Sequence, residues 1–194
     1  MKEKQDDRRI RYTKRVIRES FVHLLSQKPI AKITVVEICE MADVNRSTFY
    51  AHYTDPYDLM RKIQGEVLQE INVWMSGLIL PDSPGGFQVM KLVFEYVLAN
   101  AELCKVLLGE NGDEELQEEI MMLAQQQVMK DWPGSQEAGA RLRDYLVQFG
   151  VHAGMAVVKK WLETGLKEPP EEMADLVIRL IYHGLYSVVS KRPE

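Results

Sequence analysis

Five hydrogen-bonding side chains lie within seven residues of one another near position 50. They are Arg46, Ser47, Thr48, Tyr50 and His52. Only some of them can face a protein core, because the segment is short, and Phe49 is the natural apolar anchor among them. Guanidinium, hydroxyl and imidazole groups in this density suit contacts with the base edges and phosphates of nucleic acid.

Helix-start signals place this stretch in the second of two short helices. Thr34 and Glu37 have the spacing of a capping box, which predicts that a helix begins at Thr34. Asp43-Val44 breaks that helix, and Asn45 is positioned to cap the next one. Two such helices joined by a short turn form a helix-turn-helix, whose second helix enters the major groove of DNA.

The stretch resembles the N-terminal domain of the Tet-repressor-like (TetR) family of bacterial one-component transcription regulators. The resemblance covers roughly residues 12–59 and rests on Thr34, Ile38, Cys39, Ala42, Val44, Thr48, Phe49, Tyr50, His52, Tyr53 and Leu59. Asp43 stands where the family usually has Gly, although Asp tolerates a left-handed turn better than most residues. Thr54-Asp55-Pro56 stands where the family often has a Lys-containing segment that meets phosphate.

The predicted DNA-binding surface has base-reading and phosphate-binding parts. We expect Arg46, with Ser47 or Thr48, to reach base edges. The N-terminal amides of the helix that starts at Thr34 would add phosphate contacts. Side-chain contacts with phosphate are expected from Thr34, Tyr50, His52 and Tyr53. The whole predicted surface consists of Thr34, Asn45, Arg46, Ser47, Thr48, Tyr50, His52 and Tyr53.

Charge is distributed unevenly along the chain. Residues 1–62 hold 13 Lys and Arg against nine Asp and Glu, whereas the remainder holds 11 against 20. This asymmetry favours a basic DNA-facing module on an acidic body. Arg8, Arg9 and Arg11 cluster within residues 1–11, which we expect to be mobile. That segment is either a basic arm on DNA or a solvated terminus.

The periodicity of apolar residues predicts an all-α fold of about nine helices. The later expected helices cover residues 55–80, 87–100, 101–108, 113–132, 137–164 and 171–190, after helices at 12–27, 34–42 and 46–52. We predict a helix-turn-helix domain at 1–54 and a helical effector-binding and dimerisation domain at 55–194. The helix from residue 55 would link the two mechanically, and residues 81–86 read as a loop.

The last two expected helices are predicted to form a homodimer interface. Small residues make the first of them thin on one side, and the second carries a broad apolar stripe. Both helices could be internal core, but the TetR resemblance favours a four-helix bundle between subunits. The predicted interface consists of Gly150, Ala153, Gly154, Val157, Trp161, Val177, Leu180, Ile181, Gly184, Leu185 and Val188. Two recognition helices about 34–36 Å apart would then read a palindrome.

The TetR resemblance also implies a cavity for a small-molecule effector in the second domain. Its candidate lining residues are Phe94, Tyr96, Met121, Met122, Gln125, Tyr145, Phe149 and His152. The alternative is that these are ordinary core side chains, with His152 a hydrogen-bonded core histidine. Residues 103–109, 112–113, 161–165 and 170–173 resemble a TetR subgroup whose ligands are mostly unknown.

These observations predict a transcriptional repressor that binds a palindromic operator as a homodimer and is released or modulated by an effector. Effector binding would change the spacing of the two recognition helices. The alternative is an adaptor on the same fold that acts through a protein partner without tight DNA binding. Its support is the absence of Lys from Thr54-Asp55-Pro56.

Other classes of function find no support in the sequence. The chain has no phosphate-binding glycine loop, nucleophile elbow, His-Glu-x-x-His motif or Cys-His constellation, so no catalytic residue, metal or cofactor is predicted. Cys39 and Cys104 are expected to be buried thiols in a reducing cytoplasm. No apolar run of about 18 residues and no signal peptide is present, which predicts a cytoplasmic protein without membrane contact.

Overall fold

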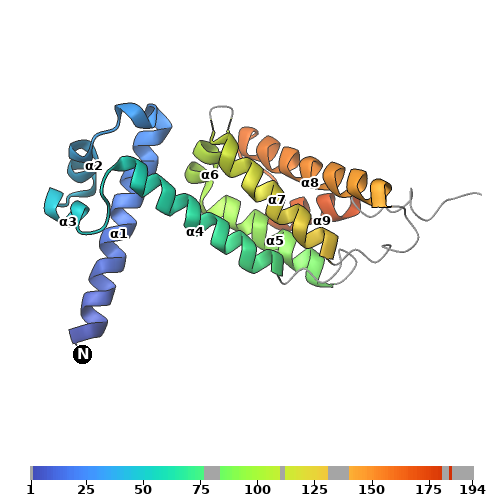
Figure 1. Cartoon of the computed structure of the whole chain (residues 1–194), viewed down its shortest axis with the longest axis horizontal. Coiled ribbons are helices and arrows are strands. Elements are labelled where there is room, and N and C mark those ends of the chain that lie inside the picture. Colours follow the sequence, from blue (N-terminus) through green and yellow to red (C-terminus); the bar gives the residue numbers. More distant parts are fainter. Residues whose placement is uncertain (1, 77–83, 110–111, 131–139, 181–183, 185–194) are drawn as a thin grey trace, which may run out of the picture. The chain divides into compact units, whose positions relative to one another are not determined.

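The computed structural model describes residues 2–76, 84–109, 112–130, 140–180 and 184, and all regular elements in these ranges are helical (Figure 1). The helices are α1 (Lys2–Gln27), α2 (Val35–Ala42), α3 (Arg46–Tyr50), α4 (Pro56–Ser76), α5 (Pro84–Ala99), α6 (Ala101–Leu108), α7 (Glu114–Lys130), α8 (Ala140–Glu163) and α9 (Pro170–Arg179), with a 3-10 turn at Ile30–Lys32. The predicted all-α fold is confirmed. None of the helices in these ranges is both long and apolar enough to cross a bilayer.

The chain divides into two compact units, Met1–Val67 and Leu68–Glu194. The first unit has a core of side chains that are completely buried, contributed by all four of its helices. These are Ile17 and Phe21 of α1, Ile38 of α2, Phe49 of α3 and Leu59 of α4. Because α4 contributes Leu59, and further along Ile63, the first unit extends into this helix. The domain boundary expected between residues 54 and 55 lies just before the start of α4 and stays a prediction.

Helix α1 is longer than the sequence pattern indicated. Residues 1–11 were expected to be mobile, as a basic arm or a solvated terminus, whereas α1 begins at Lys2 and continues without a break to Gln27. The physical reason is local, because residues 2–11 contain neither Pro nor Gly to stop a helix. Arg8, Arg9 and Arg11 are therefore exposed on a helix rather than on an extended arm.

The second unit consists of helices packed in pairs. Helix α5 packs against α9, α7 packs against α8, and α6 contacts both α7 and α8. Val89 of α5 and Ala124 of α7 are buried together, and the partly buried Ile71, Trp74 and Val151 pack against them. Helix α5 begins at Pro84, inside the segment expected to be a loop, because Pro is favourable in the first turn of a helix. Residues 77–83 lie outside the described ranges.

Among the described residues of the second unit, Trp161 is the largest buried side chain. Its ring meets Phe94 edge-on at 5.3 Å between centroids, and its indole N–H donates to the carbonyl of Glu168 at 3.2 Å. The turn that places the Glu168 carbonyl within reach of Trp161 begins at Gly165. Its φ of 89° is a backbone conformation that glycine adopts at little energetic cost. Trp161 therefore holds α5, α8 and the α8–α9 turn together.

Candidate nucleic-acid interface

Helix α2 begins at a complete capping box, as predicted. The Glu37 amide donates to Thr34 Oγ1 at 3.3 Å, and the Thr34 amide and hydroxyl donate to Glu37 Oε2 at 3.0 and 2.9 Å. Lys28 Nζ donates to the other Glu37 oxygen at 2.5 Å, which ties the chain after α1 to the start of α2. Because the Thr34 hydroxyl already donates to Glu37, it must rotate before it can donate to a phosphate.

Glu37 is strongly stabilised in its ionised form. The ammonium group of Lys28, followed by the hydrogen bonds from Thr34, lowers the pKa of Glu37 from 4.5 to about 2. A carboxylate with a lowered pKa contributes stability that is present above its unfolded pKa and is lost as the pH falls toward its folded pKa. The capping box should therefore weaken between pH 4.5 and about pH 2.

Glu37→Gln is expected to destabilise the chain at neutral pH, because the substitution removes the ion pair with Lys28 and weakens the capping box. The deficit relative to the native chain should shrink as the pH falls from 4.5 to about 2, where native Glu37 is itself protonated. Urea titrations followed by circular dichroism across this range measure the difference. Glu40→Gln, at an exposed position of α2, is the matched control. A deficit that is constant with pH would contradict this account.

The turn between α2 and α3 depends on Asp43. Asp43 has φ 51° and ψ 49°, the left-handed conformation expected of it, and the amide of Val44 donates to the carbonyl of Cys39 at 3.0 Å. Asp is among the few residues other than Gly that adopt this conformation readily. The turn therefore keeps its geometry without the Gly that is usual in the family.

Helix α3 presents a polar face above an apolar anchor. Phe49 is completely buried, whereas Arg46, Ser47 and Tyr50 are exposed and Thr48 is half-buried. Just before the helix, Asn45 occupies the capping position but its side chain makes no capping hydrogen bond. The exposed groups are thus held on a rigid helix and are available for contacts outside the unit.

Tyr53 is placed differently from the other predicted DNA-binding residues. Its side chain is 7% exposed, its ring lies 5.5 Å from that of Phe49, and Lys62 Nζ lies 5.1 Å from its centroid. Burial raises the pKa of the Tyr53 hydroxyl. Tyr53 therefore packs the end of α3 against the core, and its predicted phosphate contact stays a prediction.

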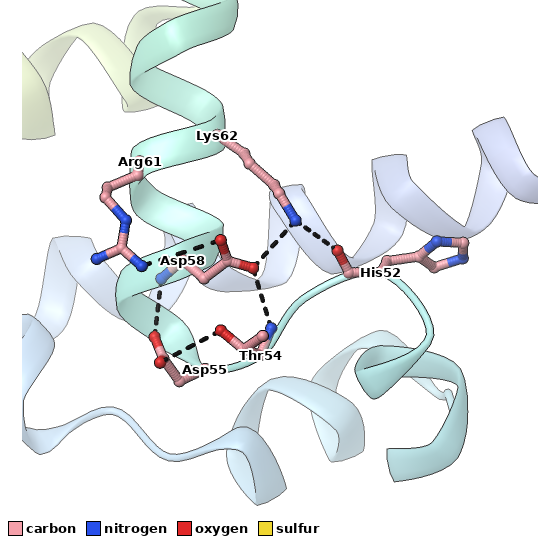
Figure 2. Close-up of polar contacts among 6 residues, drawn as sticks. All are labelled: His52, Thr54, Asp55, Asp58, Arg61 and Lys62. Carbon is pink, nitrogen blue, oxygen red and sulfur yellow. Dashed lines mark hydrogen bonds and ion pairs between the residues drawn. The ribbon is translucent and has the colours of Figure 1, made fainter.

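The start of α4 carries a polar cluster around Asp58 (Figure 2). Lys62 Nζ donates to Asp58 Oδ2 at 3.0 Å and to the backbone carbonyl of His52 at 2.8 Å. The Thr54 amide donates to Asp58 Oδ2 at 3.0 Å, and the Asp58 amide donates to Asp55 Oδ1 at 2.8 Å. We call Thr54, Asp55, Asp58 and Lys62 the Asp58 cluster. It fastens the end of α3 to α4.

Sequence reasoning did not find the role of Lys62. Its position four residues after Asp58 on a helix is the signal that could have indicated an ion pair. Its bond to the His52 carbonyl is a tertiary contact that no local spacing predicts. The hydrogen bond from Thr54, followed by the interactions with Lys62, lowers the pKa of Asp58, so this carboxylate is ionised at neutral pH.

The candidate effector residues differ widely in exposure. Phe94 is buried in the core, and Tyr96, Met121 and Gln125 are half-buried. Met122, Tyr145 and Phe149 are 51%, 71% and 66% exposed, and His152 is exposed with its Nδ1 2.8 Å from the Gln148 carbonyl. Met122, Tyr145, Phe149 and His152 therefore lie at the surface of the described chain, and their part in an effector site stays a prediction. Periodicity alone did not show which face of α8 points inward.

The candidate dimer residues also differ in exposure. Trp161 and Val177 are 2% and 3% exposed, so their side chains belong to the subunit core and not to a surface. Leu180 is 56% exposed, and a Cβ added at Gly154 or Gly184 would meet no other atom within 4 Å. Gly150, Ala153 and Val157 are half-buried. Ile181, Leu185 and Val188 lie outside the described residues.

The cysteine thiols and the possible metal ligands are the remaining groups that could carry chemistry. Cys39 and Cys104 are buried thiols outside any disulfide, as expected, and burial raises the pKa of the Cys39 thiol. Within the described residues, no group of three or more His, Cys, Asp or Glu side chains is arranged to hold a metal ion. Around α3, the exposed side chains of Arg46, Ser47 and Tyr50 offer hydrogen bonding and, at Arg46, positive charge.

Comparison with other proteins agrees with this geometry. Residues 87–183 match a TetR family model described as a transcriptional regulator C-terminal region. The chain is also 32% identical over 89 residues to the uncharacterized HTH-type transcriptional regulator YxbF of Bacillus subtilis (strain 168). That match covers 45% of this chain and only 23% of YxbF.

Solved structures share the fold at low sequence identity. The fatty acid degradation regulator FadR from Bacillus halodurans has a TM-score of 0.65 at 18% identity, covering 89% of this chain and 96% of that one. A tetR-family regulator from Streptomyces coelicolor has a TM-score of 0.66 at 16% identity, covering 90% and 83%. FadR from Bacillus subtilis in complex with stearoyl-CoA has a TM-score of 0.61 at 14% identity, covering 87% and 97%. With its matching C-terminal region, its helix-turn-helix and this shared fold, the chain belongs to the TetR family of transcriptional regulators.

Proposed function

We propose that this regulator binds a palindromic DNA operator as a homodimer in the cytoplasm, and represses transcription until a small-molecule effector weakens binding. The main support for the proposal is the division of α3 into a buried anchor and exposed polar side chains. Completely buried Phe49 fixes the helix, while Arg46, Ser47 and Tyr50 remain exposed. Side chains on a rigid element can be held in register with base edges, as base readout requires.

Exposed apolar side chains on α8 and at the end of α9 support the homodimer. On α8 these are Tyr145 and Phe149. Leu176 of α9 and Leu180, which caps the end of that helix, are 42% and 56% exposed. Residues 145 and 149 are four apart, as are 176 and 180, so each pair lies on one helix face. Monomers rarely leave large apolar patches in water, and a second copy of this chain would cover them.

A small-molecule effector is supported less directly. The Bacillus subtilis FadR structure, whose fold this chain shares, contains stearoyl-CoA. In this chain, the half-buried Tyr96, Met121 and Gln125 remain the candidate residues for an effector site in the second unit. An effector would act by favouring a spacing of the two recognition helices that does not fit the operator.

Selection of bound sequences from a random duplex pool tests the proposal. We expect an enriched palindrome whose half-sites are one helical turn, about 34–36 Å, apart. If the dimer makes about six to ten phosphate contacts, its affinity should fall by roughly 10³–10⁵ between 50 and 200 mM salt. A folded dimer that enriches no sequence would contradict the proposal.

Arg46→Lys is expected to relax base preference at one position in each half-site while retaining most salt-dependent affinity. Lys keeps the charge but cannot form the bidentate hydrogen bonds with which Arg recognises guanine. Such a bidentate contact contributes about 1–3 kcal/mol of discrimination against other bases. Competition between the selected duplex and single-base variants measures this change. Tyr50→Phe is the comparison, because loss of a phosphate-binding hydroxyl should weaken all sequences alike. If Arg46→Lys keeps the native base preference at every position, Arg46 does not recognise a base.

The adaptor hypothesis retains one structural argument. The start of α4 carries Asp55 and Asp58 where the family often has a Lys-containing segment, and acidic side chains repel DNA phosphate. If selection enriches no sequence, the chain would act instead through a protein partner. In that case, substitutions on α3 should leave its regulatory effect in cells unchanged.

A further inference from the structure

A groove lies on the surface of the first unit beside the turn between α2 and α3, two helices that contact each other (Figure 1). Its volume is about 370 Å³, within the range of about 300–1,000 Å³ that is usual for small-molecule sites. The residues that line it are Val36, Cys39, Glu40, Asp43, Val44, Asn45 and Arg46. The first four lie at positions i, i+3, i+4 and i+7 of α2 and its C-cap, so one face of this helix forms one wall of the groove.

The groove has an apolar floor and a polar rim. Cys39 is 4% exposed, and Val36 and Val44 are half-buried, so these side chains form the floor. The side chains of the rim are all exposed, and they are Glu40, Asp43, Asn45 and Arg46. The Asn45 side chain makes no capping hydrogen bond, and within the described residues the two carboxylates form no ion pair with Arg46. Two carboxylates and one guanidinium group therefore remain available around one small cavity.

The position of the groove relates it to the bases of DNA. Asn45 and Arg46 belong both to the groove and to the predicted DNA-binding surface. A recognition helix contacts base edges mainly with its N-terminal residues, and the groove lies at the N-terminal end of α3. When α3 enters the major groove as proposed, the cavity faces base edges and its carboxylates lie beside Arg46.

The polar rim is complementary to the major-groove edge of a G·C pair. Cytosine presents only an amino donor there, whereas guanine presents two acceptors, thymine an acceptor and a methyl group, and adenine an acceptor beside its amino group. A carboxylate accepts hydrogen bonds and donates none, so it attracts the amino group of cytosine and repels the acceptors of other bases. The two acceptors of the paired guanine suit the guanidinium group of Arg46.

We propose that Glu40 and Asp43 read the cytosine of a G·C pair in each operator half-site, by accepting hydrogen bonds from its amino group, while Arg46 reads the guanine of the same pair. The inference rests on the proposed DNA-binding function and adds two base-reading residues to it. The same carboxylates repel DNA phosphates, so they lower affinity for every sequence. They raise specificity, because an acceptor placed opposite them by any other base is left facing a negative charge.

Competition binding followed by fluorescence anisotropy of the full-length chain tests the inference. The variant is Glu40→Ala with Asp43→Gly, which removes both carboxylates, since Ala suits a helix and Gly suits the left-handed turn at position 43. Preference for the G·C pair over other pairs should fall by roughly 5- to 150-fold, the usual contribution of one base contact. Affinity for a random-sequence duplex should rise, because two negative charges are lost from each subunit. A merely structural role of the two residues would not produce these opposite effects.

The matched control is Glu19→Ala, which removes an exposed carboxylate of α1 outside the groove. The control should keep the native preference for the G·C pair. Circular dichroism of both variants should match that of the native chain. If the position that responds to Glu40→Ala with Asp43→Gly prefers a base pair other than G·C, the inference is wrong.

A modified operator tests the amino group directly. In this duplex, pyrimidin-2-one, which is cytosine without its amino group, stands opposite the guanine. The native chain should bind the modified operator roughly 5- to 150-fold more weakly than the unmodified one, whereas the variant without the two carboxylates should bind both alike. If native chain and variant respond equally to the analogue while the native chain enriches a palindrome, the inference is wrong and the proposed function stands. A folded native dimer that enriches no sequence would overturn both.

Discussion

Phe149→Glu is expected to convert the homodimer into monomers and to abolish most operator binding. The Phe149 side chain is 66% exposed on α8 beside Tyr145, so the substitution should disturb the proposed interface more than the subunit fold. A buried charge at each two-fold-related position has no partner and repels its copy. A monomer binds only one half-site at a time, so operator affinity should fall by a factor of about 10²–10⁴. Light scattering after size exclusion and operator titration measure the two effects.

The matched control for this experiment is Met122→Glu. Met122 is 51% exposed on α7, so the same chemical change is made outside the proposed α8–α9 interface. The control should remain a dimer, and both variants should keep the helical circular dichroism spectrum of the native chain. A Phe149→Glu variant that is still dimeric at micromolar concentration would place the interface elsewhere. A native chain that is monomeric under the same conditions would contradict the homodimer itself.

Phe49→Ala is expected to destabilise the first unit by about 3–5 kcal/mol, the usual cost of removing a fully buried aromatic ring. Phe49 is 0% exposed and contacts the rings of both Tyr50 and Tyr53, so its loss leaves α3 without an anchor. DNA binding should disappear with it, because α3 would no longer hold its polar face in one orientation. Urea titration followed by circular dichroism and anisotropy measure stability and binding.

Tyr50→Ala separates anchoring from contact with DNA. Tyr50 is the next residue and is also aromatic, but its side chain is 57% exposed. Its removal should change the free energy of unfolding by roughly 1 kcal/mol or less, while weakening DNA binding through the lost contact. If Phe49→Ala and Tyr50→Ala destabilised the chain equally, the division of α3 into a buried anchor and an exposed reading face would be wrong.

The sequence by itself determined the local features of the helix-turn-helix. The capping box at Thr34 and Glu37 involves groups three residues apart, so its geometry follows once a helix starts there. The left-handed turn at Asp43 also follows from the conformations that this residue tolerates. The all-α fold follows from periodicity in the same way. These features depend on neighbours in the sequence, and the residues that carry them can be identified without coordinates.

Only the tertiary structure decided which side chains are buried and which are exposed to a partner. The sequence pattern indicated a phosphate contact for Tyr53 and a dimer contact for Trp161, whereas packing buries both side chains inside their units. Lys62 bonds the carbonyl of His52 because the chain turns back after α3, a contact that spans ten residues and is absent from any local motif. On α8, where several faces carry apolar residues, contacts with α6 and α7 left Tyr145 and Phe149 outside. Periodicity predicts that a helix has an apolar face, but which face is buried depends on the neighbours that the fold supplies.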